Sequence, residues 1–356
     1  MLKEYPDQVL ARRATVNTKK KIDPMKKIAV IGFGFMGLTH TLNILRNKDL
    51  ELAAIVDRNP GLIEKSIGEK GGNIATGSID VSLLKDISKY STIRECLDNE
   101  NIDALCICVP TAFHYETALE ALLAGKHVFI EKPLCLDINQ ARKLIDLAKE
   151  KSRILMTGHV VRFMPPYQKL KKWIDSGEFG DLRFLSLSRF SGHPAWGQWK
   201  DREVADNSGG ALFDLVIHDI DFAAYLLGSP DNIESTCLPG YISRYDYISA
   251  IWSYNEKNAK VSIEGGNTFH ASFPFQAGYM ANFEKASILY TTMKGDLIQI
   301  SDDDTLNETE AGDAVEGYYN EIACFSKCIE NNIQPEECSP ESSLESVELC
   351  YKHIKI

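Results

Sequence analysis

The sequence lacks features that would place it in several classes of protein. No apolar stretch approaches the ~18 residues that a membrane-spanning helix requires, because the longest apolar runs, such as 105–109, are only as long as a strand. An excess of basic residues is also missing, since 39 Lys and Arg stand against 50 Asp and Glu and leave a net charge of −11. We therefore expect neither nucleic acid nor a membrane among its partners, because both would require a basic footprint.

Cysteine usage argues against a disulfide framework and against a zinc site. The 9 cysteines are an odd number spread over 356 residues, and no Cys-x-x-Cys pair occurs. Most have apolar neighbours, as Cys106 and Cys108 do, and the closest pair at helical spacing is Cys324 with Cys328. We predict reduced, buried thiols in a cytoplasmic protein with no resident metal ion.

Length and composition indicate a globular chain of two domains. Domains commonly contain ~100–200 residues, and the chain is 44% hydrophobic and 25% charged. Residues 1–24 differ, because they are basic, show little hydrophobic periodicity and contain no apolar segment of a secretory signal. We predict that 1–24 form a disordered or non-native N-terminal extension, that 25–158 form the first domain, and that 159–356 form the second.

Strands and helices alternate in the first domain. The pattern predicts buried strands at 28–31, 52–56, 104–109, 127–130 and 154–157. It predicts the intervening helices at 36–47, 115–123 and 138–149. This alternation is typical of a doubly wound parallel sheet of the α/β class, which binds ligands at the carboxyl ends of its strands. Five residues of interest directly follow such strands: Gly32, Asp57, Pro110, Glu131 and His159.

The second half has a different pattern. Helices are predicted at 165–176, 211–227, 318–331 and 340–353, and strands at 182–189, 247–254, 260–264 and 283–290. The β-branched and aromatic content of these strands favours a largely antiparallel sheet in an α+β domain. The acidic stretch 302–313 lacks the ligand order of a calcium loop, so we interpret it as a solvated hairpin loop.

A glycine motif joins the first predicted strand to the first predicted helix, and it reads Gly32-Phe33-Gly34-Phe35-Met36-Gly37. In this context the first glycine permits a tight turn, the second lets the backbone approach a pyrophosphate, and the third lets the helix pack on the strand. Bound phosphates would also interact with the free N–H groups at the start of the helix. The motif therefore predicts a dinucleotide site.

The residue at the end of the second strand bears on the choice of dinucleotide. An acidic side chain is expected there, ~20 residues after the motif, and Asp57 occupies the position. Its carboxylate can accept both ribose hydroxyls and would repel a 2′-phosphate, which favours NAD over NADP. The neighbouring Arg58 leaves NADP open, because an arginine can pair with that phosphate.

Two further features suggest catalysis. Lys132, in the segment Glu131-Lys132-Pro133, follows the strand predicted at 127–130, where a charged side chain is costly unless it has a partner or a task. Asp214 and His218 lie four residues apart on a predicted helix and therefore share a face. A carboxylate beside an imidazole raises its proton affinity, which suits a general base. The alternatives are a surface lysine paired with a carboxylate and a satisfied buried histidine.

Other side chains have two interpretations each. Arg162 either contacts a ligand or forms a structural ion pair, and Asp221 could cap or pair within the fold. Trp196 and Trp199 lie in a polar, glycine-rich loop, where an aromatic face could cover a sugar or simply anchor the loop.

Taken together, these residues resemble those of the Gfo/Idh/MocA oxidoreductases. The similarity covers nearly all of the chain from Met25. It includes Pro110-Thr111-x-x-His114, Gly158-His159-x-x-Arg162-Phe163 and Asp214-x-x-x-His218-Asp219-Ile220-Asp221. Its most specific part is Glu131-Lys132-Pro133 after a strand, combined with Asp214-x-x-x-His218 in the second half.

The resemblance implies an NAD(P)-binding Rossmann domain followed by a substrate-binding domain with a large, mostly antiparallel open sheet. That sheet would form the interface of a homodimer or homotetramer. The implied reaction is hydride transfer between NAD, or NADP, and a hydroxyl or keto carbon of a sugar, inositol or related polyol. Cofactor contacts then extend to Pro110, Thr111, His114, Glu131 and Lys132, and substrate contacts to Lys132, Arg162, Trp199, Asp214 and His218.

In this scheme His218 removes the hydroxyl proton, Lys132 stabilises the developing alkoxide, and Asp214 orients the substrate, Lys132 or His218. Whether Lys132 or His218 carries the proton stays open. Two other functions also stay open: an NADP(H)-dependent keto-sugar reductase, and a non-catalytic nucleotide-sensing regulator on the same fold.

Overall fold

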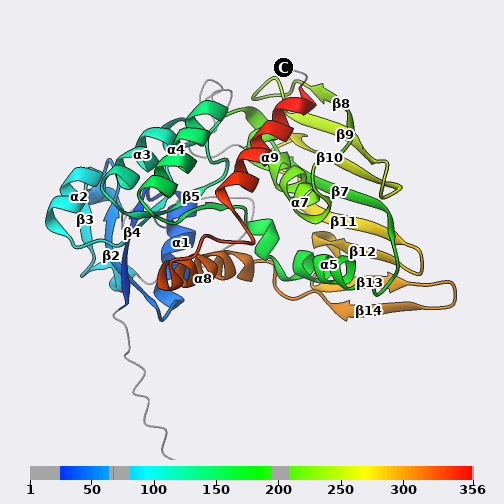
Figure 1. Ribbon diagram of the computed structural model, residues 1–356, viewed down its shortest axis with the longest axis horizontal. Coiled ribbons are helices and arrows are strands. Elements are labelled where there is room, and N and C mark those ends of the chain that lie inside the picture. Colours follow the sequence, from blue (N-terminus) through cyan, green and yellow to red (C-terminus); the bar gives the residue numbers. More distant parts are fainter. Residues whose placement is uncertain (1–24, 64–66, 68–80, 195–207, 355–356) are drawn as a thin grey trace, which may run out of the picture.

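The computed structural model describes residues 25–63, 67, 81–194 and 208–354, which are arranged around two β-sheets (Figure 1). The predicted N-terminal extension, 1–24, lies outside the described residues. Within them, no helix combines the length and the apolar composition that spanning a membrane would need.

The first sheet, sheet A, is parallel and has six strands in the order β3-β2-β1-β4-β5-β6. Its strands are β1 (Lys26–Ile31), β2 (Leu50–Val56), β3 (Ser88–Tyr90), β4 (Ala104–Ile107), β5 (His127–Glu131) and β6 (Leu155–Gly158). The strand order reverses between β1 and β4, and the crevice at such a reversal is where doubly wound sheets bind their ligands. The predicted Rossmann architecture is confirmed.

Helices cover both faces of sheet A because its central strands are apolar on both sides. Successive residues of β5 point to opposite faces: Val128 packs with Leu144 of α4, whereas Phe129 packs with Ile44 of α1 and Phe325 of α8. The helices concerned are α1 (Phe35–Arg46), α2 (Ile93–Asn99), α3 (His114–Leu123), α4 (Ile138–Glu150) and α8 (Glu316–Asn331). A helix from the C-terminal part of the chain therefore completes the core of the first sheet.

The second sheet, sheet B, has eight strands in the order β14-β13-β12-β11-β7-β10-β9-β8. They are β7 (Leu182–Gly192), β8 (Asn232–Leu238), β9 (Tyr247–Tyr254), β10 (Ala259–Phe269), β11 (Gln276–Phe283), β12 (Ser287–Thr291), β13 (Leu297–Ser301) and β14 (Leu306–Glu310). Neighbours are antiparallel except β7 and β10, which run parallel. The large, mostly antiparallel sheet is thus confirmed.

The prediction of a single strand at 283–290 is wrong. The segment starts with a hairpin turn, in which the N–H of Phe283 donates to the carbonyl of Ala286, and continues as β12 from Ser287. The acidic stretch 302–313 does belong to a hairpin, as expected. Asp302 accepts the backbone N–H groups of Asp304 and Thr305 in its turn, although β14 takes up part of the stretch.

Three helices cover the face of sheet B that is turned towards sheet A (Figure 1). They are α5 (Pro165–Ser176), α7 (Ile217–Leu227) and α9 (Pro340–His353). Leu170, Ile220 and Val347 from these helices pack in one core with Leu185 and Trp252 of the sheet. Seen in Figure 1, the other face of sheet B carries no helix among the described residues.

Two buried ion pairs tie α7 to its surroundings. Asp219 accepts two hydrogen bonds from Arg189 of β7, at 3.0 and 2.9 Å. Asp221 accepts two from Arg162, at 2.8 and 2.6 Å. Since all four side chains are at most 4% exposed, each charge depends on its partner for solvation.

We predict that Arg189→Met lowers the free energy of unfolding by about 3–5 kcal/mol, because it leaves the Asp219 carboxylate buried and unpaired. The control is Arg183→Met on the same strand, since Arg183 pairs with Glu284 at the surface, with side-chain exposures of 42% and 39%. That change should cost no more than about 1 kcal/mol. Denaturant titration measures both values, and equal losses in the two variants would contradict the prediction.

Candidate active site

The glycine turn between β1 and α1 is closely packed everywhere except at its middle glycine. Gly32 has a φ of +85°, and a Cβ there would lie 2.9 Å from the carbonyl oxygen of Cys108. A Cβ on Gly37 would lie 2.1 Å from the carbonyl oxygen of Gly32. A Cβ on Gly34 would meet nothing within 4 Å. The turn therefore leaves an open approach at Gly34, where the motif places a pyrophosphate.

The start of α1 is suited to bind an anion. Gly34 is the N-cap, so it provides no side-chain acceptor, and the first turn contains no acidic residue. The predicted contacts of Phe35 and Met36 would use backbone N–H groups at the positive end of this helix. Phe33 differs, because its side chain is buried in the core of sheet A and its N–H donates to Asp57.

Asp57 lies beside the glycine turn, as its place after β2 predicts. Its Oδ2 accepts the N–H of Phe33 at 2.9 Å and its Oδ1 accepts the N–H of Asn59 at 3.0 Å. A carboxylate has about four acceptor positions, so two hydrogen bonds leave capacity for ribose hydroxyls. The guanidinium of Arg58 lies over the ring of Phe113, 5.4 Å from its centroid.

The loop after β4 holds two further predicted contacts. Pro110 precedes a short 3-10 turn, η4 (Thr111–Phe113), and its carbonyl accepts the N–H of Phe113. Both Pro110 and Thr111 are half-buried at the carboxyl end of β4. Because Arg58 stacks on Phe113, this loop and the end of β2 border the same part of the crevice.

The structure corrects the cofactor contact predicted for His114. Its side chain is only 1% exposed, and its two ring nitrogens lie 2.8 and 3.0 Å from the carbonyl oxygens of Pro133 and Val109. Burial lowers the pKa of this imidazole. Both nitrogens face backbone carbonyl oxygens inside the protein, and a neutral imidazole donates its single N–H to one of them. His114 therefore contacts the loop around Pro133 and turns no polar atom towards a nucleotide.

Glu131 also needs correction as a direct ligand. One carboxylate oxygen lies 2.6 Å from Nε2 of His40, and the other accepts the N–H of Lys132. Burial alone would lower the pKa of His40, but the negative charges of Cys106, Glu131 and Glu321 and the hydrogen bond with Glu131 raise it to about 9. Sequence reasoning missed His40, although a run of polar residues on the inner side of α1, 39–41 and 43, was a usable signal.

Lys132 meets Asp214, and this contact joins the two sheets. The Lys132 Nζ donates to Oδ1 of Asp214 at 2.9 Å and also to its backbone carbonyl. The side chains are 13% and 36% exposed, so the pair lies at an accessible surface. The Lys132–Pro133 peptide bond is cis.

Asp214 does not pair with His218 as the helical spacing predicted. The segment expected to be a single α-helix begins with a π-helical turn, η7 (Leu212–Val216), which directs Asp214 towards Lys132. Such turns are often found at functional sites. No hydrogen bond joins Asp214 to His218 among the described side chains, and the expected rise in proton affinity is also wrong. Burial, followed by the charges of Lys132 and Arg189, lowers the pKa of His218 well below 6.5.

His218 therefore enters the site as a neutral imidazole whose Nδ1 is buried without a hydrogen-bond partner in the described structure. His159, at the end of β6, adds a second neutral ring. Burial lowers its pKa to about 4, although the nearby Asp221 carboxylate acts in the opposite direction. Together with Lys132, these rings form a group with one fixed positive charge and two neutral nitrogen bases.

Arg162 is structural, which corrects its predicted substrate contact. Besides Asp221, its guanidinium donates to the carbonyl of Glu337 and to Oγ of Ser342, both at 2.9 Å. It also stacks on Tyr225 at 4.8 Å. All of its donor nitrogens are thus engaged. The predicted contact from Trp199, like the position of Trp196, lies outside the described residues.

Two family models match the chain and account for most of it. Residues 26–159 match the model described as "Oxidoreductase family, NAD-binding Rossmann fold", which carries the name GFO_IDH_MocA. Residues 167–288 match the model described as "GFO/IDH/MocA C-terminal domain". The glycine turn, the open approach at Gly34 and Asp57 all lie within the first match and fit its NAD-binding description.

Curated relatives extend over almost the same length. The chain is 27% identical over 322 residues to "Inositol 2-dehydrogenase" of Rhizobium meliloti, which covers 86% of this chain and 90% of that protein. It is 27% identical over 330 residues to "scyllo-inositol 2-dehydrogenase (NAD(+))" of Bacillus subtilis, with 87% of each chain covered. A solved oxidoreductase from Agrobacterium radiobacter, in complex with NAD+, L-tartaric acid and magnesium, is 16% identical with a TM-score of 0.75 over 93% of this chain and 96% of that one.

The contrast between Gly34 and Gly37 provides a test of the cofactor site. We predict that Gly34→Ala leaves the melting temperature unchanged, because its Cβ points into open space, but weakens NADH binding at least about 10-fold by blocking the pyrophosphate. Gly37→Ala should destabilise the fold itself, because its Cβ collides with a backbone oxygen. Thermal melting and NADH fluorescence separate the two effects. Undiminished NADH binding by a folded Gly34→Ala variant would refute the site.

Proposed function

Because the chain belongs to the Gfo/Idh/MocA family of NAD-binding oxidoreductases, we propose that it oxidises a hydroxyl-bearing carbon of an inositol, a sugar or a related polyol. The observation that carries this proposal is the placement of Lys132, Asp214 and a neutral His218 together, where β5 ends near the glycine turn. The names of two relatives, both inositol dehydrogenases, support a cyclitol as the first substrate to try.

NAD, when bound, supplies the hydride acceptor for this oxidation. The chain itself has to manage the proton and the negative charge on the substrate oxygen. A neutral His218 can accept the hydroxyl proton, and the ammonium of Lys132 can donate a hydrogen bond to the same oxygen as charge develops on it. Asp214 is a positioning residue, because it holds Nζ of Lys132 at 2.9 Å.

We propose NAD rather than NADP as the working cofactor. The Asp57 carboxylate beside the turn would repel a 2′-phosphate, and Arg58 is directed to Phe113. If Arg58 instead turns to bind the 2′-phosphate, the expected function is the reduction of a keto-sugar with NADPH. We propose the cytoplasm as the compartment, since all nine cysteines are unpaired and thiols persist where the environment is reducing.

We also propose that the chain forms a homodimer or homotetramer through the open face of sheet B. Phe184, Ile251 and Met280 are 38%, 38% and 53% exposed on outward-facing positions of β7, β9 and β11. Residues that pair across neighbouring strands form a single row on this face, which runs from Ile251 through Ser262 and Ser186 to Met280. A monomer in sedimentation velocity at micromolar concentration would refute this interface.

The central test is turnover with and without Lys132. We expect wild-type protein to generate NADH, followed at 340 nm, with at least one cyclitol or sugar of a polyol panel. Lys132→Met should lower kcat by about 100-fold or more, because it removes the charge that stabilises the alkoxide, while NADH binding changes less than about threefold. Lys143→Met, at an exposed position of α4, is the control and should keep full activity.

Titrations with NADH and NADPH in parallel complete this experiment. Tighter binding of NADH supports Asp57 as the residue that selects NAD, whereas tighter binding of NADPH would favour a keto-sugar reductase. Cofactor binding with no turnover on any substrate, or full activity in Lys132→Met, would contradict the catalytic proposal and favour a nucleotide-sensing regulator.

The pH dependence of kcat/KM tests the role of His218. Its pKa lies well below 6.5, so the proton-accepting form already dominates at neutral pH. Activity in the oxidative direction should then stay level from pH 6.5 to 8 and decrease only as the pH falls through the pKa of His218. His218→Asn should remove this acidic limb as well as slow the reaction. A limb with its midpoint above pH 6.5 would exclude His218 as the base.

A further inference from the structure

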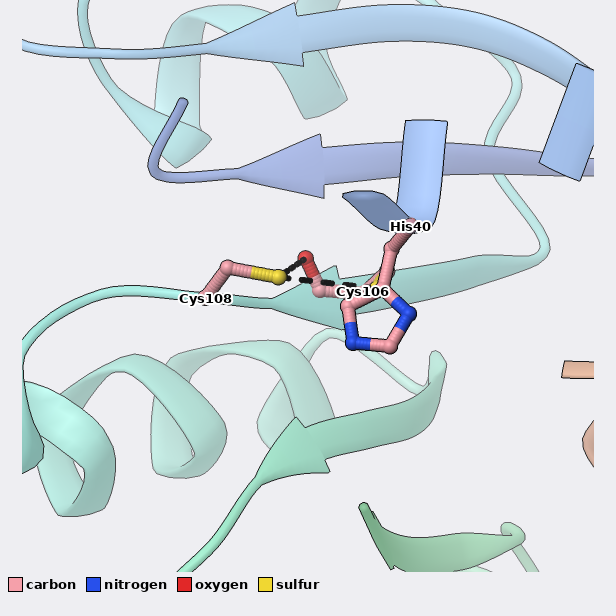
Figure 2. A group of neighbouring side chains, drawn as sticks. All are labelled: His40, Cys106 and Cys108. Carbon is pink, nitrogen blue, oxygen red and sulfur yellow. Dashed lines mark hydrogen bonds between the residues drawn. The ribbon is translucent and has the colours of Figure 1, made fainter. Parts of the chain in front are cut away.

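Beneath the glycine turn lies a cluster of five polar side chains that the proposed reaction does not use as ligands. His40 comes from α1, Cys106 and Cys108 from β4 and the residue after it, Glu131 from β5, and Glu321 from α8. Figure 2 shows His40 directly beside the two cysteines. Four of the five are less than a tenth exposed, and Cys108 is half-buried.

We propose that this cluster binds a divalent transition-metal ion of the zinc class, with His40, Cys106 and Cys108 as its ligands. Imidazole and thiolate are the ligands that zinc prefers, and four ligands in a tetrahedron are its usual structural arrangement. The proposal replaces the expectation from the sequence that the chain has no resident metal ion, which for zinc depended on the absence of Cys or His pairs at short spacing.

The distances between the ligand atoms fit a tetrahedral ion. The two sulfurs are 3.8 Å apart, and two zinc–sulfur bonds of ~2.3 Å at the tetrahedral angle would separate them by about 3.8 Å. A ring nitrogen of His40 and both sulfurs all lie within 4.8 Å of one another. The oxygens of Glu131 and Glu321 form a second such group with His40, and Glu321 Oε1 lies 4.0 Å from Nε2 of His40.

Unsatisfied polar atoms point to a missing cation rather than to a closed hydrogen-bond network. Nδ1 of His40 and both carboxylate oxygens of Glu321 are buried with no hydrogen-bond partner among the described residues. Buried polar atoms are rarely left in this state, because it costs free energy of desolvation.

The surroundings of His40 match those of a metal ligand. Glu131 engages Nε2 of the ring at 2.6 Å, and a metal-bound histidine commonly holds a carboxylate on its other nitrogen in this way.

An ion at this place would connect two elements that meet under the cofactor site. It would join α1, which starts at the glycine turn, to β4 and the residue after it. Cys108 lies next to that turn, since its carbonyl oxygen is the atom that a Cβ on Gly32 would meet. Metal binding is thus expected to stabilise the turn that receives the pyrophosphate.

The test uses the purified full chain and zinc itself, with a chromophoric chelator as competitor. We expect one tightly held zinc ion per chain, and a thiolate-to-cobalt charge-transfer band in the near ultraviolet when cobalt replaces it. Cys106→Ser should weaken zinc binding by more than about 100-fold, the upper end of what loss of an outer-sphere partner costs. The matched control is the double variant Cys324→Ser/Cys328→Ser, which removes a thiol pair on α8 outside the cluster.

A second variant, Cys108→Ser, guards against misfolding, because this side chain is half-buried. Far-ultraviolet circular dichroism reports whether each variant is folded. Zinc binding that is absent from the wild type, or equally tight in the wild type and in folded Cys106→Ser and Cys108→Ser, would overturn the proposal. A protonated Glu321 would then account for the cluster, since burial raises the pKa of that carboxyl well above its usual range. None of these readouts depends on turnover, so the outcome is separate from that of the proposed reaction.

Discussion

The ion pair between Lys132 and Asp214 is the contact on which the active site depends. The lysine follows β5 of sheet A, whereas the aspartate lies in the π-helical turn that precedes α7 on sheet B. The lysine ammonium therefore comes from sheet A, whereas His218, the base that we propose, comes from α7 on sheet B. An accessible pair of this kind contributes little to stability, and its importance lies in fixing where the ammonium group is held.

The groups that surround this pair are anchored by buried charges. Arg189 holds Asp219, and Arg162 holds Asp221, so α7 is attached at two positions shortly after His218. The positive charge of Arg189 also helps to keep His218 neutral. On the other side of the crevice, His40 holds Glu131, which precedes Lys132. Preorganisation of this kind is what lets a site stabilise charge without rearranging during the reaction.

Local patterns predicted much of the fold, and they failed where long-range contacts decide. The helix predicted at 340–353 has those ends in the structure, because Ser339 caps its start and Pro340 occupies its first turn. The hairpin at Phe283 was read as one strand because its polar turn is only a few residues long. Strands such as β8, with alternating half-buried and exposed residues at the edge of sheet B, have little hydrophobic signal of their own.

In the candidate site, too, local patterns predicted some features correctly and long-range contacts decided the others. Residues whose role depends on backbone geometry, such as Gly32 and Gly37, lie where their motif predicted. Roles that depend on the partner of a side chain were misassigned for Arg162 and Glu131, because their partners Ser342 and His40 lie 180 and 91 residues away in the chain. His114 was misassigned although its partners are near in sequence, because only the folded loop turns its ring inwards. Spacing of four residues suggested that Asp214 serves His218, and only the π-helical turn reveals that it serves Lys132. Pairing across the two sheets cannot be read from either segment alone.

The most direct test of this account is a double-mutant cycle on the rate of NADH formation in a single turnover. The rate is measured for wild type, Lys132→Met, Asp214→Asn and the double variant, with the best polyol substrate. If Asp214 acts by holding Lys132, the double variant should be no slower than Lys132→Met, within about threefold, because residues that act as a unit are not additive. Losses that multiply would show that the two side chains act independently, which would contradict the account.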